Sequence, residues 1–132
     1  MKISEIMAAG RPGLSFEVFP PKRRTASDAD AERAAMERTK RVVREIAAAH
    51  PAFMSVTYGA AGGTTGANTC ELARFVQDDC GVPALAHMTC IAADRAKVAD
   101  EVRGFRAAGV ENILCLRGDC PPDTEFPGNP AF

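Results

Sequence analysis

Four short apolar stretches with strand character recur along the chain, and longer stretches with helical spacing lie between them. The short stretches are rich in Val, Ile, Leu and Phe, and they alternate or cluster in the manner of β-strands. We predict that these strands begin near residues 14, 52, 84 and 111. The gaps between them carry apolar residues near helical spacing. We predict helices over residues 28–49, 69–80 and 95–108.

The ends and inner faces of these helices can be assigned from particular residues. Asn68, with Glu71 three positions later, fits a capping box, Asp94 fits a helix N-cap, and His50-Pro51 ends the first long helix. Gly81 and Gly109 follow the other two helices as stop signals. The residues that we expect to face the core are Leu14, Phe16, Val18, Ala35, Val42, Val43, Ile46, Leu72, Phe75, Val76, Val98, Val102 and Phe105.

The regular alternation of strand and helix predicts a parallel sheet with right-handed crossovers. Four such units make half of an eight-unit barrel, which usually needs about 250 residues. We therefore predict an α/β fold of the (βα)8 TIM-barrel type in which about the first four βα units are present, as a single domain over residues 1–132. A short amphipathic helix (1–9, with Ile3, Ile6 and Met7 on one side) precedes the units, and an open loop (118–132) follows them.

The last strand, over residues 111–117, is continuously apolar from Ile113 to Leu116, which is typical of a strand covered on both faces. A free four-stranded sheet would leave two unpaired edges. We therefore expect a truncated chain or half of an assembly.

Composition and charge narrow the class of protein. The chain is 46% hydrophobic and 25% charged, as in ordinary globular proteins, and its net charge is −1. This balance gives no reason to expect nucleic acid or an anionic membrane as a partner. No apolar run approaches the roughly 20 residues of a membrane span, and residues 1–10 lack the features of a signal peptide. We expect a cytoplasmic protein.

Five cysteines are present, and no Cys-x-x-Cys motif pairs them. An odd number without paired spacing favours buried, reduced thiols in a cytosolic protein. A metal site formed by His87, Cys90 and Cys120 is the alternative. Because paired ligand spacing is missing, we predict that no metal is bound.

The second predicted strand runs out at Thr57 or Tyr58 into a glycine-rich loop, with four glycines among residues 59–66. Backbone without Cβ atoms can approach a flat ring or a phosphate closely. In alternating strand–helix proteins, ligands bind where strands end and such loops begin. This loop is therefore a candidate binding site.

Polar residues stand at the carboxyl ends of all four predicted strands. They are Glu17, Thr57, His87 and Asp119. Each alone has an ordinary explanation, such as a solvent-facing glutamate, a hydrogen-bonded core histidine or a turn aspartate. Parallel strands bring their carboxyl ends to one rim, however, and four polar ends beside a glycine-rich loop together predict a small-molecule site there.

These residues also lie within four short motifs that resemble a known family. The motifs FEVFPPK (16–22), VTYGA (56–60), HMTC (87–90) and LRGD (116–119) are similar to the four successive strand-end motifs of methylenetetrahydrofolate reductases. They occur in the family's order and at its approximate spacing, and the likeness runs from about residue 14 to residue 122.

The resemblance implies a flavin-bearing barrel that reduces 5,10-methylenetetrahydrofolate to 5-methyltetrahydrofolate, in one-carbon metabolism and methionine supply. FAD would carry the hydride, and NADH or NADPH would donate it. A cytoplasmic enzyme that is a homo-oligomer when full length is implied as well. The other half of such a barrel supplies further FAD contacts, so we expect these 132 residues alone to bind FAD weakly or not at all.

The resemblance also implies roles for individual residues. Glu17 matches the proton donor, which helps to open the five-membered ring of the folate, and Asp119 matches a residue near both the flavin and the folate. These two are the expected catalytic and substrate-binding residues. Thr57 would also lie near the nicotinamide, and Ala60 and Gly118 would act through their backbone. The residues expected to line the FAD are Thr57, Tyr58, Ala60, His87, Arg117, Gly118 and Asp119.

Two other classes of function stay open. The chain could be a non-catalytic half-barrel that serves as a binding or assembly module. It could also be a barrel of different chemistry: an aldolase would need a lysine at a strand end, which none of the four strands has, whereas a pterin-binding synthase is compatible with the fold alone.

Overall fold

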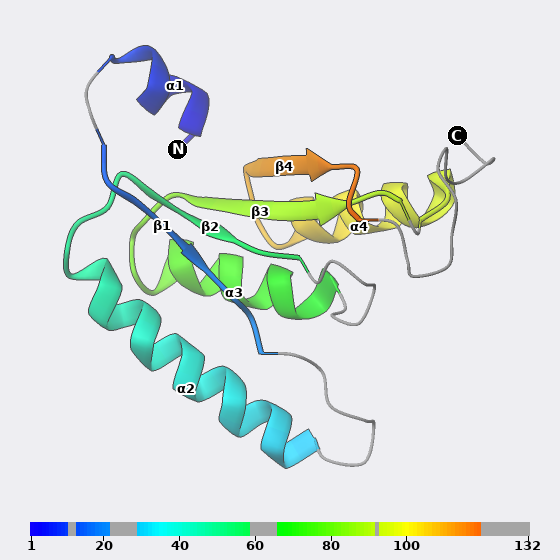
Figure 1. Cartoon of the computed structure of the whole chain (residues 1–132), viewed down its shortest axis with the longest axis horizontal. Helices are drawn as coiled ribbons and strands as arrows, with labels where there is room; N and C mark the ends of the chain where they lie inside the picture. The colour runs from blue at the N-terminus through cyan, green and yellow to red at the C-terminus, as the bar shows by residue number, and fades with distance from the viewer. Residues whose placement is uncertain (11–12, 22–28, 59–65, 92, 120–132) are drawn as a thin grey trace.

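The computed structural model describes residues 1–10, 13–21, 29–58, 66–91 and 93–119 of the chain (Figure 1). The strands are β1 (Ser15–Val18), β2 (Phe53–Val56), β3 (Ala84–Thr89) and β4 (Asn112–Leu116). The helices are α1 (Ile3–Ala8), α2 (Ala29–Ala47), α3 (Gly66–Asp78) and α4 (Arg95–Ala107). The four strands form one sheet in the order β1-β2-β3-β4, and every pair is parallel.

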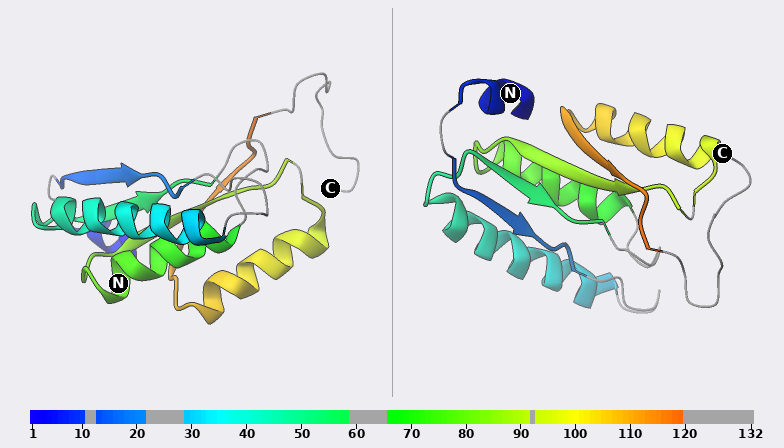
Figure 2. Two further views of the ribbon diagram at one scale, coloured as in Figure 1. Left: turned by 90° about the horizontal axis from the view of Figure 1, so that it is seen from below. Right: turned by 45° about the horizontal axis from the view of Figure 1, so that its top comes forward.

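This arrangement confirms the predicted α/β pattern, in which a helix connects each strand to the next. It is consistent with the first βα units of a barrel. Figure 2 shows that α2, α3 and α4 all lie on one side of the sheet. The opposite side, onto which Figure 1 looks, carries no helix among the described residues, and we call it the helix-free face.

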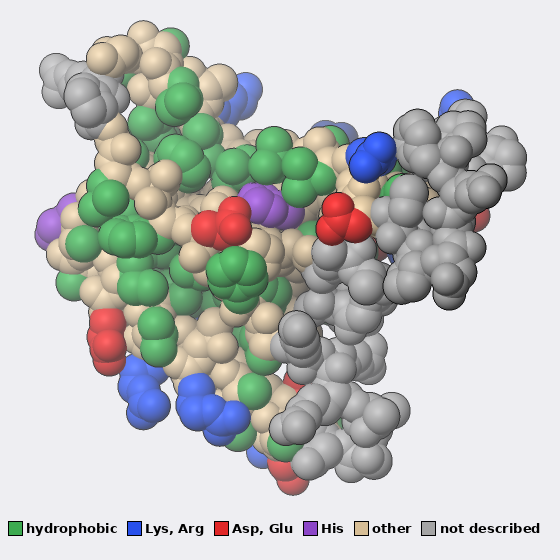
Figure 3. Space-filling model, viewed as in Figure 1, with side chains coloured by type: hydrophobic (Ala, Val, Ile, Leu, Met, Phe, Trp, Pro, Cys, Tyr) green, Lys and Arg blue, Asp and Glu red, His purple; other side chains and the backbone are tan. Residues whose placement is uncertain are grey.

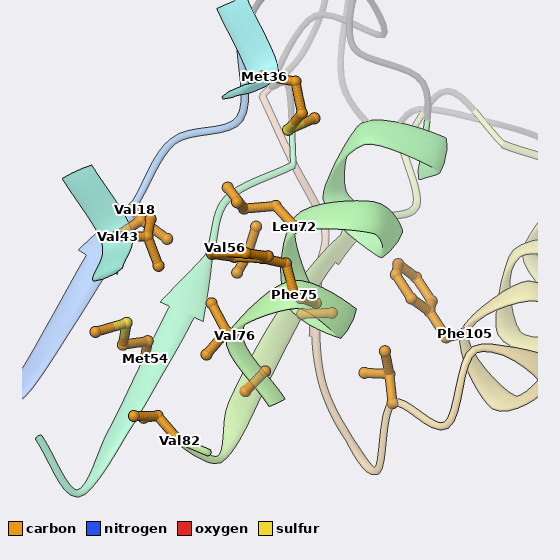
Figure 4. Close-up of a cluster of buried hydrophobic side chains, with 14 of the residues drawn as sticks. Val18, Met36, Val43, Met54, Val56, Leu72, Phe75, Val76, Val82 and Phe105 are labelled. Atoms are coloured by element: carbon orange, nitrogen blue, oxygen red, sulfur yellow. The ribbon is translucent and has the colours of Figure 1, made fainter. Parts of the chain in front are cut away.

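The core fills the layer between the sheet and its three helices (Figure 4). Val56 of β2 is in register with Val18 of β1 and Ala86 of β3, and all three are buried. Since side chains alternate between the faces of a strand, this row points toward the helices and the neighbouring rows point away. The helices contribute buried side chains to the same core: Val43, Leu72, Phe75, Val76 and Phe105.

Polar contacts join α2 to α3 at the edge of this core. Lys40 forms ion pairs with Glu37 and Glu71, and the Glu71 carboxylate is the main reason why the pKa of Lys40 is raised. The Arg44 guanidinium lies 4.8 Å from the centre of the Phe75 ring, which is within cation–π range.

The start of α3 differs from the prediction. The helix begins at Gly66, so Asn68 lies inside its first turn and is buried, and the predicted capping box with Glu71 is wrong. Tertiary partners decide the outcome, because the Asn68 amide donates to Pro21 O and to Glu32 Oε1. The predicted cap of α4 is confirmed: Asp94 accepts a hydrogen bond of 2.8 Å from the Lys97 N–H.

The inner face of α2 also differs in part. Met36 and Val43, seven residues apart and thus on one side of the helix, are buried, whereas Val42 is 50% exposed and faces away. Ala35 and Ile46 are half-buried. Elsewhere Phe16, Val98 and Val102 are half-buried, and Leu14 is exposed against expectation.

The fourth strand is not covered on both faces as predicted. Leu114 and Leu116 are 39% and 37% exposed, because β4 is an edge strand of the described sheet and the described helices cover only its other side. At its amino end Asn112 connects β4 to the first residues of the chain: the Ile3 N–H donates to its Oδ1, and its Nδ2 donates to Met1 O.

Neighbouring valines of α2 provide a matched test of this packing. Val43→Ala removes two methyl groups from a site that is 1% exposed, and we expect a loss of about 2 kcal/mol in the free energy of unfolding. Val42→Ala removes the same atoms from the exposed side, and the expected change is below about 0.5 kcal/mol. Urea denaturation of both variants measures the difference, and equal losses would contradict the assigned helix face.

Candidate functional site

Three side chains from three neighbouring strands meet on the helix-free face. The Ser55 hydroxyl of β2 donates a hydrogen bond of 3.4 Å to Glu17 Oε2 of β1. The His87 Nε2 of β3 lies 3.7 Å from the same carboxylate oxygen. Ser55 and His87 are buried, whereas the Glu17 side chain is 49% exposed. The sheet thus presents one accessible carboxylate that is supported from beneath by two buried polar groups.

Strand register explains how these residues come together. Glu17 is directly opposite Ser55, one position before the buried Val18–Val56 pair, so both side chains point to the helix-free face. The Thr57 N–H donates to Val18 O at 3.0 Å, which continues the ladder past the end of β2. Of the four residues predicted to share one rim, Glu17 and His87 therefore lie close together.

The prediction that His87 stands at the end of its strand is wrong. β3 continues to Thr89, because pairing with β4 extends through Thr89 and Leu116 and the Cys90 N–H donates to Leu116 O. His87 consequently lies within the sheet, where its imidazole is close to the Glu17 carboxylate.

Both residues that precede the glycine-rich loop are anchored. The buried Thr69 hydroxyl of α3 donates a hydrogen bond of 3.0 Å to Thr57 O. The Tyr58 hydroxyl donates one of 2.6 Å to Glu101 Oε1 of α4. The phenol of Tyr58 is thus engaged with a helix. Ala60 and the rest of the loop, residues 59–65, lie outside the described residues.

The end of β4 turns sharply at Gly118, whose φ of +86° is one that residues with a side chain rarely adopt. A Cβ at this position would lie 3.1 Å from Thr89 Cβ and from Ile91 Cγ2, so the backbone passes very close to the end of β3. The Arg117 Nε donates to Gly118 O. Asp119 follows with an exposed side chain at the carboxyl edge of the sheet.

Apolar side chains surround these polar groups. Phe19, Leu114 and Leu116 are large and exposed, and Figure 3 shows hydrophobic atoms spread around acidic groups and a histidine on this side of the molecule. A largely apolar surface with a few convergent polar groups is typical of sites for flat organic ligands. The arrangement thus offers apolar contact surface next to a carboxyl group that is able to transfer a proton.

The metal site considered as an alternative, formed by His87, Cys90 and Cys120, lies partly outside the described residues. Among the described residues no group of three or more His, Cys, Asp or Glu side chains could hold a metal ion, and Cys120 lies outside them. Cys70, Cys80 and Cys90 are half-buried free thiols, and burial raises the pKa of each. The prediction of buried thiols is wrong for Cys115, which is free and exposed on the edge strand.

Sequence reasoning missed Ser55, Thr69 and Glu101. The alternation of β2 could have indicated Ser55, since it stands two positions before Thr57 and so shares its face. No local signal identifies Thr69 or Glu101, because their partners lie 12 and 43 residues away along the chain.

Comparison with known proteins adds an independent observation. Residues 2–131 match the family model described as "Methylenetetrahydrofolate reductase". The chain belongs to the methylenetetrahydrofolate reductase family. The resemblance of the four strand-end motifs is thereby confirmed over nearly the whole chain.

Individual members of the methylenetetrahydrofolate reductase family show the same relationship. The chain is 38% identical over 121 residues to the probable methylenetetrahydrofolate reductase (NADH) of Oryza sativa, and 34% identical over 119 residues to the 5,10-methylenetetrahydrofolate reductase of Escherichia coli. These alignments cover 91% and 89% of the chain but only 18% and 36% of the two relatives. The chain thus spans well under half the length of the reductases that it matches.

Within the described part of the chain, no helix is both long enough and apolar enough to cross a bilayer.

The contact between Tyr58 and Glu101 can be measured directly, because Tyr58 is the only tyrosine and the chain has no tryptophan. Burial, and then the hydrogen bond to Glu101, raise the pKa of Tyr58 above its ordinary value of 10.0. In a phenolate absorbance titration, we expect a midpoint above 10.0 in the folded chain and a return to that value in urea. Glu101→Gln should lower the midpoint only part of the way, since burial persists.

The same shift has a consequence for stability. The neutral phenol is favoured in the fold, so its contribution to stability is complete below pH 10.0 and is lost as the pH rises through the higher folded-state pKa. A titration midpoint that is equal in the folded chain and in urea would contradict the contact.

Proposed function

We propose that this chain forms the amino-terminal half of a flavin-dependent reductase that converts 5,10-methylenetetrahydrofolate into 5-methyltetrahydrofolate with electrons from NAD(P)H. Family membership supports the reaction class. The observation that carries the proposal is the accessible Glu17 carboxylate, which lies beside Ser55 and His87 on the helix-free face. A reduction that opens a folate ring needs a proton donor of this kind.

The surface around Glu17 suits a flavin. The exposed apolar side chains of Phe19, Leu114 and Leu116 offer contact to a flat ring. The glycines among residues 59–66 would add backbone that a ring or phosphate can approach closely. When bound, FAD supplies hydride transfer between the nicotinamide and the folate. The residues proposed to hold it are Thr57, Tyr58, Ala60, His87, Arg117, Gly118 and Asp119.

Glu17 is proposed to act as the proton donor. It would protonate a nitrogen of the five-membered folate ring, so that the ring opens to a reactive iminium that accepts hydride. Since charge develops on the carboxylate as the proton leaves, the nearby Ser55 hydroxyl and the imidazole of His87 are suitably placed to stabilise the ionised group.

Asp119 is proposed to stabilise the positive charge that develops on the folate. Its carboxylate follows Gly118 at the carboxyl edge of the sheet and is exposed. A negative charge there would stabilise the cationic iminium and influence the electronic properties of the flavin. Thr57 is proposed to lie near the nicotinamide as well.

The donor is proposed to be NADH in the first instance. The Oryza sativa relative carries NADH in its name, whereas the Escherichia coli relative is named without a donor. A cytoplasmic location and a homo-oligomeric state of the full-length protein remain predictions from the family.

A non-catalytic assembly module is the second candidate. The exposed Leu114 and Leu116 lie on an edge strand, and β1 forms the other edge of the described sheet. Such edges and apolar surface would suit docking of another half-barrel, with or without chemistry. Activity measurements separate the two candidates.

Binding of FAD to the chain alone tests how much of the flavin site it contains. The described sheet would cover only one side of a bound ring, so we expect little FAD to stay with the chain in gel filtration after incubation with FAD. The visible absorbance band of flavin in the protein peak measures this. A stoichiometric band would show that the second half of the barrel is not needed for binding.

Glu17→Gln tests the proton donor in a chimera in which residues 2–131 replace the matching segment of the Escherichia coli relative. We expect folate reduction to fall by at least about a hundredfold, the usual contribution of general acid catalysis. Reduction of menadione by NADH, which needs no proton on folate, should fall far less. Unchanged folate reduction would exclude Glu17 as the donor, and a chimera that binds FAD but reduces no folate would contradict the proposed function.

A further inference from the structure

We propose that Ser55 is a positioning residue that holds the Glu17 carboxyl group in the orientation needed for proton transfer. This inference rests on the function proposed above. The observation behind it is the hydrogen bond from Ser55 Oγ to Glu17 Oε2, between residues that lie side by side in the register of β1 and β2.

Ser55 is well suited to hold a neighbour in place. It lies in an inner strand that pairs with β1 on one side and β3 on the other, in register with Glu17 and Leu85. It is only 8% exposed, and the residues before and after it, Met54 and Val56, are fully buried. Its hydroxyl therefore projects from a fixed backbone position onto the helix-free face.

Glu17 needs such support. It lies on an edge strand, its side chain is 49% exposed, and a glutamate has three rotatable side-chain bonds. Both polar groups near it approach the same oxygen, since Ser55 Oγ and His87 Nε2 lie 3.4 Å and 3.7 Å from Oε2. Among the described residues, none donates a hydrogen bond to Oε1. One oxygen is thus held by these two groups, and a substrate would approach the other.

The direction of the hydrogen bond favours proton donation. The Ser55 hydroxyl donates to an oxygen that becomes negatively charged when the proton leaves, so the bond strengthens as the reaction proceeds. A group whose interaction grows toward the transition state raises kcat rather than tightening substrate binding. Loss of the hydroxyl should therefore slow the folate step specifically.

A purely structural explanation is that a buried serine simply satisfies its hydroxyl with the nearest acceptor. On that explanation Ser55→Ala would alter stability and leave the balance between reactions unaffected. The two explanations are separated by the ratio of folate reduction to menadione reduction, because only the first reaction uses the Glu17 proton.

The first experiment uses the chimera described above with Ser55→Ala, Ser55→Thr and, as a matched control, Ser15→Ala. Ser15 lies two positions before Glu17 in β1, is exposed, and has no hydrogen bond to Glu17 among the described residues. We expect Ser55→Ala to lower the ratio of kcat values about tenfold, as for the loss of one hydrogen bond to a charged group. Ser55→Thr, which keeps a hydroxyl, should restore most of the ratio, and Ser15→Ala should not change it.

The second experiment tests the contact in the 132-residue chain, without any cofactor. Urea midpoints are measured for Ser55→Ala, Glu17→Gln and the double variant. If the two side chains interact as described, the shift of the double variant differs from the sum of the single shifts. Additive shifts would overturn the contact and the proposal with it.

The outcomes distinguish this inference from the proposed function. An active chimera whose ratio is unchanged by Ser55→Ala, or is lowered equally by Ser15→Ala, overturns the positioning role alone. A chimera that binds FAD but reduces no folate overturns the proposed function, and the positioning role falls with it. A lower ratio in Ser55→Ala together with a nearly normal ratio in Ser55→Thr supports both the positioning role and the proposed function.

Discussion

The packing of α3 across the two inner strands is the contact on which the other features of this structure depend. Leu72, Ala73 and Val76 of α3 are fully buried, as are Met54 and Val56 of β2 and Ala84 and Ala86 of β3. This apolar layer requires the odd-numbered and even-numbered positions of each strand to face opposite ways. A register shift of one residue would move Glu17, Ser55 and His87 into the layer of helices, where a carboxylate would be costly to bury.

Because of this constraint, the two sides of the sheet have different roles. The helix side contains the apolar residues that stabilise the fold, and the helix-free face carries the polar residues that are candidates for chemistry. Contacts from the helices then fix the ends of the strands: Asn68 of α3 binds Pro21, Thr69 binds Thr57 O, and Glu101 of α4 binds Tyr58. Side chains of the helices thus hold the segments that follow β1 and β2 in place beside the site.

The sequence was sufficient for the pattern of elements and for the family, but less so for details that depend on tertiary partners. Strand and helix positions follow from local periodicity, and Asp94 caps α4 because its partner is three residues away. Asn68 also has the local signature of a cap, yet its amide finds Pro21 and Glu32 instead. The apolar run of β4 suggested cover on both faces, but composition cannot tell whether a partner layer is present. Ser55 was not predicted, because its contact with Glu17 depends on the register between β2 and β1.

The two outer strands give the chain a property that has nothing to do with folate. The outer edges of β1 and β4 present backbone N–H and C=O groups that no described strand pairs, next to exposed Leu14, Phe19, Leu114 and Leu116. Unprotected edges with apolar neighbours are templates for strand addition by further copies. A strand that paired with either edge would therefore also protect the chain from association with its own copies.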